Sequence, residues 1–254
     1  MMRELPKIDR VVPPGRRLFR RPAGPLASLG RALRGWNLGG VSALATPLDP
    51  ATTPRVPRFG LAERVVHWAV ALSFLYAALS GLALWSPALY PLAAIFGGGP
   101  ATQAWHPWAG VLFALVLCVM FSGWSRQMRL TAEDRRWLRL AHRYLTHQEC
   151  GLPEADRFNA GQKCLFWTQA AGAAVLLASG LVLWWPEAAP RTLRLIAILV
   201  HPAAAVVAIG GLIVHIYMGA AAVPGALRGM IQGWVSPGWA RSHHPAWYRR
   251  MLGR

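Results

Sequence analysis

The sequence predicts an all-α membrane protein built as a bundle of four membrane-spanning helices. Of its 254 residues, 54% are hydrophobic and 15% are charged, which is rich in apolar residues for a soluble domain but ordinary for a small membrane protein. The apolar residues are concentrated in four long runs, each near the roughly 20 residues that a helix needs to cross a bilayer. We expect the spans at about residues 64–85, 105–124, 164–185 and 195–220.

The first 56 residues differ in composition from the rest of the chain. They are rich in Arg, Pro and Gly, and no apolar stretch followed by a cleavage site is present, so they do not resemble a secretory signal. We expect residues 1–56 to form a basic, disordered N-terminal extension. Residues 57–254 are then the membrane domain, which ends in a tail of residues 221–254.

The connection between the second and third spans, residues 125–163, is expected to carry an amphipathic helix at the membrane surface. Thr131 and Asp134 have the spacing of a capping box, with Asp in place of Glu. After them, arginines interleave with Trp, Leu and Tyr, a pattern that directs basic side chains toward the phosphate headgroups of membrane lipid.

The orientation follows from the distribution of positive charge. Twelve Lys and Arg precede or open the first span, eight lie in the 125–163 loop and five follow residue 220. Only Arg191 and Arg194 lie in the two remaining loops, 86–104 and 186–194. By the positive-inside rule, both termini are cytoplasmic and these two short loops face outward. Because the net charge of +17 is segregated around the spans in this way, we exclude a nucleic-acid-binding protein.

Four histidines lie within the spans and form two depth layers. His67 and His215 fall near the cytoplasmic side (the inner pair), while His106 and His201 fall toward the outside (the outer pair). An ionisable residue inside a membrane span is costly and is a functional candidate by default, although a single buried histidine is more often a hydrogen-bonded core residue. His201 and His215 are 14 residues apart, so they lie about 21 Å apart on nearly the same helix face.

Four layered histidines are what two bis-histidine haems require, with the histidine nitrogens as ligands of the haem iron. The three cysteines form neither a C-x-x-C nor a C-x-x-C-H motif, which argues against an iron–sulfur or zinc site and excludes covalent c-type haem. The sequence therefore predicts two non-covalent haem b groups, an inner one on His67 and His215 and an outer one on His106 and His201.

Several segments resemble the gamma subunit of membrane-bound respiratory formate dehydrogenase, a cytochrome b of the b556 type. The similarity covers about residue 57 to the C-terminus, and its most specific motifs are F-N-A-G-Q-K before the third span, H-I-Y-M in the fourth span and H-H-P-x-W-Y in the tail. The resemblance implies four spans that hold two b haems, with the same pairing of His67 with His215 and of His106 with His201.

The resemblance also implies a quinone site and partner subunits. The quinone pocket of that family lies beside the cytoplasmic haem, and its segment corresponds here to Asn159, Gly161 and the adjoining Gln162. Asn159 alone is equally consistent with a helix N-cap, and one side chain can do both. The implied partners, on the outer face, are an iron–sulfur beta subunit and an alpha subunit that holds a molybdenum or tungsten pterin. Electrons would pass through both haems to quinone in the bacterial inner membrane.

Two other functions remain open at this stage. The first is a cytochrome b of another quinone-linked oxidoreductase, of the hydrogenase or thiosulfate or polysulfide reductase type, because histidine-ligated haems in helical bundles are common to them. The second is a small transporter or a haem-free membrane anchor, but no repeated, broken-helix substrate site is recognisable.

Overall fold

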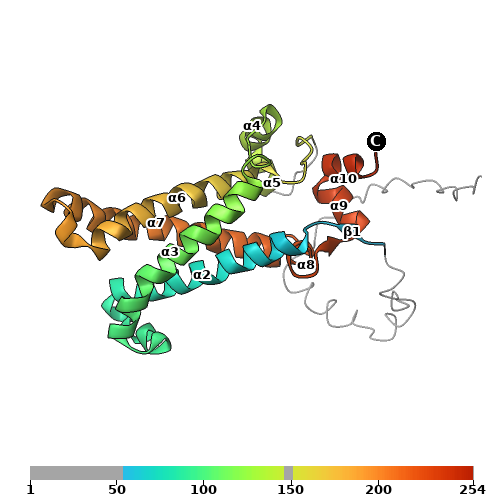
Figure 1. Cartoon of the computed structure of the whole chain (residues 1–254). Coiled ribbons are helices and arrows are strands. Elements are labelled where there is room, and N and C mark those ends of the chain that lie inside the picture. Colours follow the sequence, from blue (N-terminus) through green and yellow to red (C-terminus); the bar gives the residue numbers. More distant parts are fainter. Residues whose placement is uncertain (1–53, 146–150, 254) are drawn as a thin grey trace, which may run out of the picture. The chain divides into compact units, whose positions relative to one another are not determined.

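Four long helices form most of the structure, a computed structural model that describes residues 54–145 and 151–253. They are α2 (Leu61–Trp85), α3 (Gly99–Trp124), α6 (Ala160–Trp184) and α7 (Arg191–Tyr217). Each is long and apolar enough to cross a membrane, and they run alongside one another (Figure 1). The predicted four-helix membrane bundle is confirmed. The prediction of disorder for the N-terminal extension falls almost entirely on residues 1–53, which lie outside the described residues.

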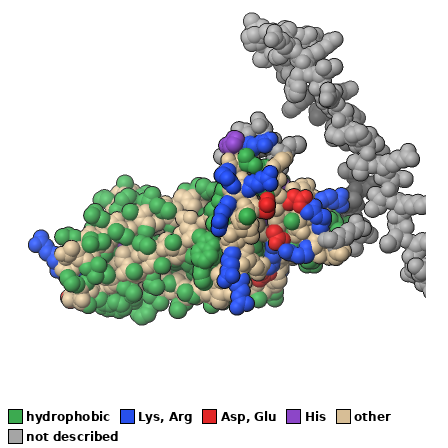
Figure 2. Space-filling view, turned by 90° about the horizontal axis from the view of Figure 1, so that it is seen from above, with side chains coloured by type: hydrophobic (Ala, Val, Ile, Leu, Met, Phe, Trp, Pro, Cys, Tyr) green, Lys and Arg blue, Asp and Glu red, His purple; other side chains and the backbone are tan. Residues whose placement is uncertain are grey.

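The bundle is assembled from two helix pairs. Helix α2 packs along α3, and α6 packs along α7, while contacts of α3 with α6 and of α2 with α7 join the two pairs. A small apolar core lies between them. Its buried members are Phe74, Phe113, Leu117, Ala173 and Ala208. Most large apolar side chains on the four helices instead point outward, which suits a surface in contact with lipid tails, and Figure 2 shows them covering the long part of the molecule.

Each long helix begins a few residues before its apolar run, and the local cause differs between the helices. The backbone N–H of Gly60 donates to Glu63 at 2.9 Å at the start of α2. Helix α3 starts at Gly99 rather than near residue 105, after Gly98 with a φ of 92° and with Pro100 in the first turn, where proline is favoured. Asn159 caps α6, and α7 begins at Arg191 directly after Pro190.

The 125–163 loop contains two short helices where one amphipathic helix was expected. Helix α4 (Ala132–Arg139) begins with the predicted capping box, in which Thr131 Oγ1 accepts from the Asp134 N–H at 3.2 Å. The chain leaves helical geometry at Leu140 and resumes as α5 (Ala141–Leu145). The Lys163 ammonium donates to Asp134 at 2.6 Å, and both side chains are largely buried. This ion pair fastens α4 to the first turn of α6.

The remaining elements gather at the two ends of the bundle. At one end are the connections η1 (Pro87–Phe96) and η2 (Pro186–Ala188). At the other end are a π-helical turn and the short elements of the tail. They are η3 (Met218–Ala222), α8 (Ala226–Gln232), β2 (Trp234–Val235), α9 (Pro237–His243) and α10 (Pro245–Met251). A band of Lys and Arg side chains marks the boundary between this second end and the apolar surface (Figure 2).

The tail is held against the segment that precedes α2. Strand β1 (Val56–Pro57) pairs antiparallel with β2, Val56 opposite Val235 and Pro57 opposite Trp234. Beside this pairing, Arg58 is 4% exposed and His244 is 2% exposed. Their side chains meet at 3.2 Å between Arg58 Nη2 and His244 Nε2. We call the β1–β2 pair together with this buried contact the terminal clasp.

The hydrogen bonds of the clasp require a neutral histidine. His244 Nδ1 lies 2.6 Å from the Asp156 carbonyl oxygen and donates to it, so Nε2 is left to accept from the Arg58 guanidinium. Burial lowers the pKa of His244 to about 3, and the neighbouring Arg58 charge acts in the same direction. Aromatic rings surround Arg58, and the ring of Trp247 lies 4.6 Å from the guanidinium carbon. The buried charge therefore lies among aromatic rings and hydrogen-bonds through Nη2, while Nη1 has no hydrogen-bond partner among the described residues.

Acid is expected to release the clasp. A histidine pKa that falls from 6.5 to about 3 on docking means that the undocked tail binds a proton below pH 6.5 while the docked tail does not. Docking is then fully stable above that pH and weakens as the pH falls, by about 1.4 kcal/mol between about pH 7.5 and 5.5. The measurement is the rate of tryptic cleavage in residues 237–253 at the two pH values.

The comparison needs two variants at each pH. With each rate divided by that of trypsin on a free peptide at the same pH, His244→Gln removes the titrating group and should abolish the pH dependence of cleavage, whereas His243→Gln alters the neighbouring histidine and should keep it. Equal pH dependence in the wild type and in His244→Gln would show that another group controls docking.

Candidate functional site

The structure brings the four span histidines together as two pairs. In the outer pair, His106 of α3 faces His201 of α7 with 6.3 Å between ring centroids. In the inner pair, His67 of α2 faces His215 of α7 with 5.9 Å between ring centroids. Helix α6 contributes no histidine, and α7 contributes one to each pair.

These separations suit a metal between the rings. With metal–nitrogen bonds of about 2 Å, as for imidazole on zinc, the centres of two trans imidazoles lie about 6 Å apart. Within residues 54–145 and 151–253, no group of three or more His, Cys, Asp or Glu could hold a bare ion. Two opposed imidazoles therefore fit a metal whose other ligands come with it, as the four porphyrin nitrogens of haem do.

Hydrogen bonds show which ring nitrogen of the outer pair is free. Ser80 Oγ donates to the Tyr76 carbonyl at 2.7 Å and lies 2.9 Å from His106 Nδ1. Because the hydroxyl has only one proton, its oxygen accepts the Nδ1 proton of His106. The proton is thus held on Nδ1, and Nε2 carries the lone pair that a metal needs.

His201 is held in the same way by α6. Ser179 Oγ donates to the Val175 carbonyl at 2.6 Å and lies 3.0 Å from His201 Nδ1. Both outer rings therefore present Nε2 as a ligand, and each takes its orientation from the helix that precedes its own.

Two glycines provide the space for the outer rings. A Cβ on Gly81 would lie 3.0 Å from His106 Cε1, and a Cβ on Gly180 would lie 3.2 Å from His201 Cε1. Each ring consequently packs on the backbone of a neighbouring helix. Gly110 and Gly210 differ from them, because a Cβ at either position would meet no described atom within 4 Å.

The inner pair has a different environment. His67 Nδ1 is buried and has no hydrogen-bond partner among the described residues. The Trp68 ring lies edge-on to the His67 ring with 5.4 Å between centroids, and the Trp68 indole donates to the Met230 carbonyl at 3.3 Å. The inner rings thus lie close to α8, near the terminal clasp.

The segment expected to bind quinone forms the first turn of α6. Asn159 Oδ1 accepts from the Gln162 N–H at 2.9 Å, and Gln162 Oε1 accepts from the Asn159 N–H at 3.0 Å, which is a reciprocal capping box. The cap uses the oxygen of the Asn159 amide and leaves its NH2 group available. A Cβ on Gly161 would lie 3.4 Å from that oxygen. Lys163, the next residue, is anchored by Asp134.

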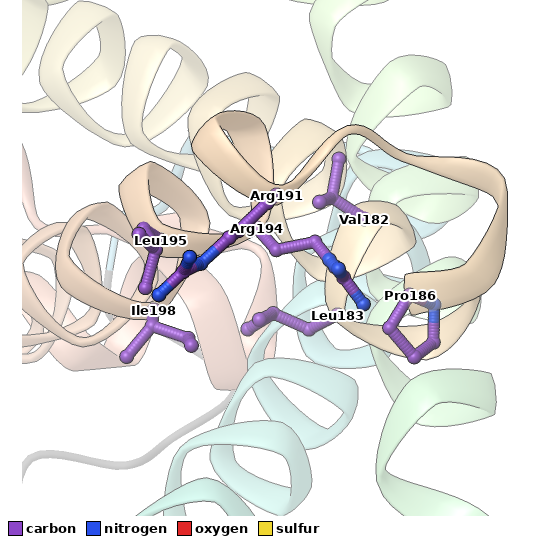
Figure 3. Close-up of a pocket in the computed structure, with 7 residues that line it drawn as sticks. All are labelled: Val182, Leu183, Pro186, Arg191, Arg194, Leu195 and Ile198. Carbon is purple, nitrogen blue, oxygen red and sulfur yellow. The ribbon is translucent and has the colours of Figure 1, made fainter.

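A groove of about 300 Å³ lies at the opposite end, between α6 and α7 (Figure 3). Its lining residues are Val182, Leu183, Pro186, Arg191, Arg194, Leu195 and Ile198. The lining includes neither histidine pair, so we do not assign the candidate site to it.

Two features of the site were not anticipated from the sequence. They are the serine partners of the outer histidines and the buried contact of Arg58 with His244. A repeated motif in the sequence could have pointed to the serines: S-G-L-x-L-W occurs at Ser80–Trp85 and again, 99 residues later, at Ser179–Trp184. Each outer histidine also precedes proline, so the two helix pairs form an internal repeat.

Comparison with known proteins agrees with this architecture. The family model described as prokaryotic cytochrome b561 matches residues 58–233, which include all four long helices up to the end of α8. The chain belongs to this family, and it is a multi-pass protein of the bacterial inner membrane. A cytochrome b binds haem b, and the two histidine pairs described above fit that group.

Among curated relatives, the chain is similar to cytochrome b556 subunits of formate dehydrogenase. It is 35% identical over 201 residues to the cytochrome b556(fdo) subunit of Escherichia coli K12, an alignment that covers 77% of this chain and 93% of the relative. The nitrate-inducible cytochrome b556(Fdn) subunit of the same strain is 34% identical, with 74% and 88% covered. The cytochrome b556 subunit of Haemophilus influenzae is 33% identical, with 80% and 86% covered.

Side chains added at Gly81 should reduce haem binding. Gly81→Ala places a Cβ at 3.0 Å from the His106 ring and should weaken haem retention, and Gly81→Val should do so more strongly because the ring has to move aside. The measurement is b-type haem per purified chain after detergent washing.

The matched control is Gly172→Ala on α6. Its Cβ would lie 4.0 Å from the Ala208 Cβ, an ordinary contact, and haem content should not change. Full haem retention by Gly81→Val would show that the His106 ring is not held against Gly81 when the cofactor is bound.

Proposed function

We propose that this chain is the di-haem cytochrome b subunit of a respiratory formate dehydrogenase, which anchors the complex and passes electrons across the membrane to quinone. The observation that carries the proposal is the presence of two histidine pairs whose ring separations leave room for a haem iron that both rings of a pair would hold. The names of the relatives support the formate dehydrogenase assignment.

The proposed direction of transfer rests on the charge distribution. The basic residues gather at the end of the bundle that carries the clasp, and the positive-inside rule assigns that end, with both termini, to the cytoplasm. The outer pair then lies toward the periplasm and the inner pair toward the cytoplasm. His201 and His215 on α7 are separated by about 21 Å along the helix axis, so the two pairs divide the apolar thickness between them.

The roles of individual residues follow from their contacts. His106 and His201 would hold the outer haem b through Nε2, and His67 and His215 would hold the inner haem b. When bound, haem supplies one-electron redox chemistry. Asn159, Gly161 and Gln162, at the start of α6, would form the quinone site, in which the free amide NH2 of Asn159 donates to a quinone oxygen.

Formate oxidation is assigned to partner subunits. An iron–sulfur beta subunit would dock on the outer face beside the outer haem, and an alpha subunit with a molybdenum or tungsten pterin would oxidise formate. A cytochrome b of a hydrogenase or of another quinone-linked oxidoreductase would use the same histidine pairs. The identity of the catalytic subunit that co-purifies with this chain separates these two assignments.

Histidine substitutions test the two layers. The purified wild-type chain should contain about two haems that acid acetone extracts. His106→Ala and His201→Ala should lose the same spectral component, since each removes one ligand of the outer haem. His67→Ala and His215→Ala should lose the other component. A pyridine haemochrome assay and reduced-minus-oxidised spectra provide the measurement.

The control is His243→Ala in the tail, which should keep both components. If His67→Ala and His201→Ala removed one component while His215→Ala removed the other, the pairing would be wrong. A wild-type chain without a b-type band would contradict the proposed function as a whole.

Substitutions at the start of α6 test the quinone site. Asn159→Ala should slow quinone turnover, because loss of one hydrogen bond to a neutral oxygen costs about 0.5–1.5 kcal/mol. Gly161→Leu should slow it more by filling the pocket. The measurement is formate-to-quinone activity beside formate-to-dye activity in the intact complex, where dye activity and haem content should not change.

Asn159→Asp separates the two roles of Asn159. Aspartate is an equally good N-cap, but its ionised carboxylate only accepts hydrogen bonds, so the cap is kept while the quinone donor is lost. We expect it to behave like Asn159→Ala in the quinone assay. Full activity in Asn159→Asp would assign the segment to capping alone.

A further inference from the structure

The two histidine pairs differ in what holds their Nδ1 protons. In the outer pair, both rings donate Nδ1–H to a serine oxygen, at 2.9 Å for His106 and 3.0 Å for His201. In the inner pair, His67 Nδ1 is buried and without a partner among the described residues. The difference follows from the internal repeat. Ser80 and Ser179 occupy equivalent positions in the two repeats, so each outer histidine has a serine partner. His67 has no histidine equivalent, because Phe166 occupies the corresponding position in the second repeat.

The difference has a chemical consequence for a bound metal. A histidine ligand that donates its second N–H to an acceptor becomes more basic and binds the metal more strongly. The effect favours the oxidised, more positive iron, and hydrogen bonding around the ligand is one of the ways in which a protein sets haem potential. The outer pair has two such acceptors, whereas His67 Nδ1 in the inner pair has none among the described residues. The reduction potential of a haem on the outer pair is therefore lowered relative to that of a haem on the inner pair.

We propose that Ser80 and Ser179 are positioning residues that fix the outer histidines and make the outer haem the lower-potential of the two. The proposal rests on the di-haem function proposed above. It explains how one chain with four equivalent ligands favours electron movement from the outer haem to the inner haem, toward the quinone side. The serines act through the histidines and do not contact the metal.

The serine positions are well suited to this role. Ser80 is 0% exposed and Ser179 is 8% exposed, so solvent does not compete for the histidine proton. Each hydroxyl proton is already committed to a helix carbonyl, of Tyr76 and Val175 respectively, so the oxygen can act only as an acceptor toward the ring. The adjacent Gly81 and Gly180 allow the rings to approach these hydroxyls.

The test is a redox titration of the two b components in the purified full-length chain. Ser80→Ala and Ser179→Ala should each raise the midpoint potential of the component that His106→Ala removes, and the other component should not move. The expected change is up to about tenfold in the reduction equilibrium, which corresponds to ~59 mV for one electron. The electron paramagnetic resonance of the oxidised outer haem should change as well, since it reports ligand basicity.

Ser73→Ala is the matched control. Ser73 lies on the same helix, is 7% exposed and donates to the carbonyls of Ala69 and Val70 in the same way, at 2.7 and 3.1 Å. This variant should leave both potentials unchanged. Ser179→Thr keeps the hydroxyl and should restore the wild-type potential, which a purely structural role of the small side chain does not predict.

The outcomes separate the inference from the function on which it rests. Two b components whose potentials are unchanged in both Ser→Ala variants, or that shift equally in Ser73→Ala, would overturn the serine proposal and leave the di-haem function standing. A wild-type chain without two b components would overturn both. If Ser80→Ala lost the outer haem entirely, Ser179→Ala and Ser179→Thr would still decide the question.

Discussion

A polar group inside a lipid-facing bundle is stabilised when it finds a partner within the protein, and the outer histidine pair meets this constraint through the way the helices are paired. An unbonded polar group in an apolar environment costs roughly 2–7 kcal/mol, and lipid tails offer no hydrogen bonds. His106 on α3 meets the requirement through Ser80 on α2, and His201 on α7 meets it through Ser179 on α6. These contacts fix the register of each helix pair, and the outer layer follows from them.

The internal repeat explains why one layer is symmetric and the other is not. A spacing of 99 residues relates the first helices of the two repeats, as in Arg58 and Arg157, Phe59 and Phe158, and Ser80 and Ser179. In both of these helices, the side chain of the third helical residue accepts a hydrogen bond from the backbone N–H of the residue before the helix. The outer pair takes one histidine from the second helix of each repeat. The inner pair instead takes His67 from the first helix of one repeat and His215 from the second helix of the other. Phe166 lies 99 residues after His67. In the second helices of the repeats the spacing is the 95 residues between His106 and His201, which relates His215 to Met120. Phe166 and Met120 both pack in the apolar core.

The sequence was sufficient for the features that depend on composition and helical period. The four spans could be predicted because their apolar runs are long, and the pairs could be predicted because depth in the membrane follows from position along a helix. Side-chain hydrogen bonds between helices could not, since Ser80 and Ser179 look like ordinary small residues of a membrane helix until the neighbouring ring is placed. The start of α3 at Gly99 depends on a glycine with positive φ, and the burial of Arg58 depends on a partner 186 residues away.

The terminal clasp ties the timing of folding to the completion of the chain. Strand β1 and Arg58 are synthesised before the first membrane helix, whereas β2 and His244 are synthesised after the fourth. During synthesis, the Arg58 side chain therefore remains solvated until all four helices have been made and the tail lies on the same side of the membrane as β1. A chain with one helix inserted in the wrong direction would leave the two halves on opposite sides of the bilayer. Closure of the clasp thus reports that all four crossings have been completed with the correct topology.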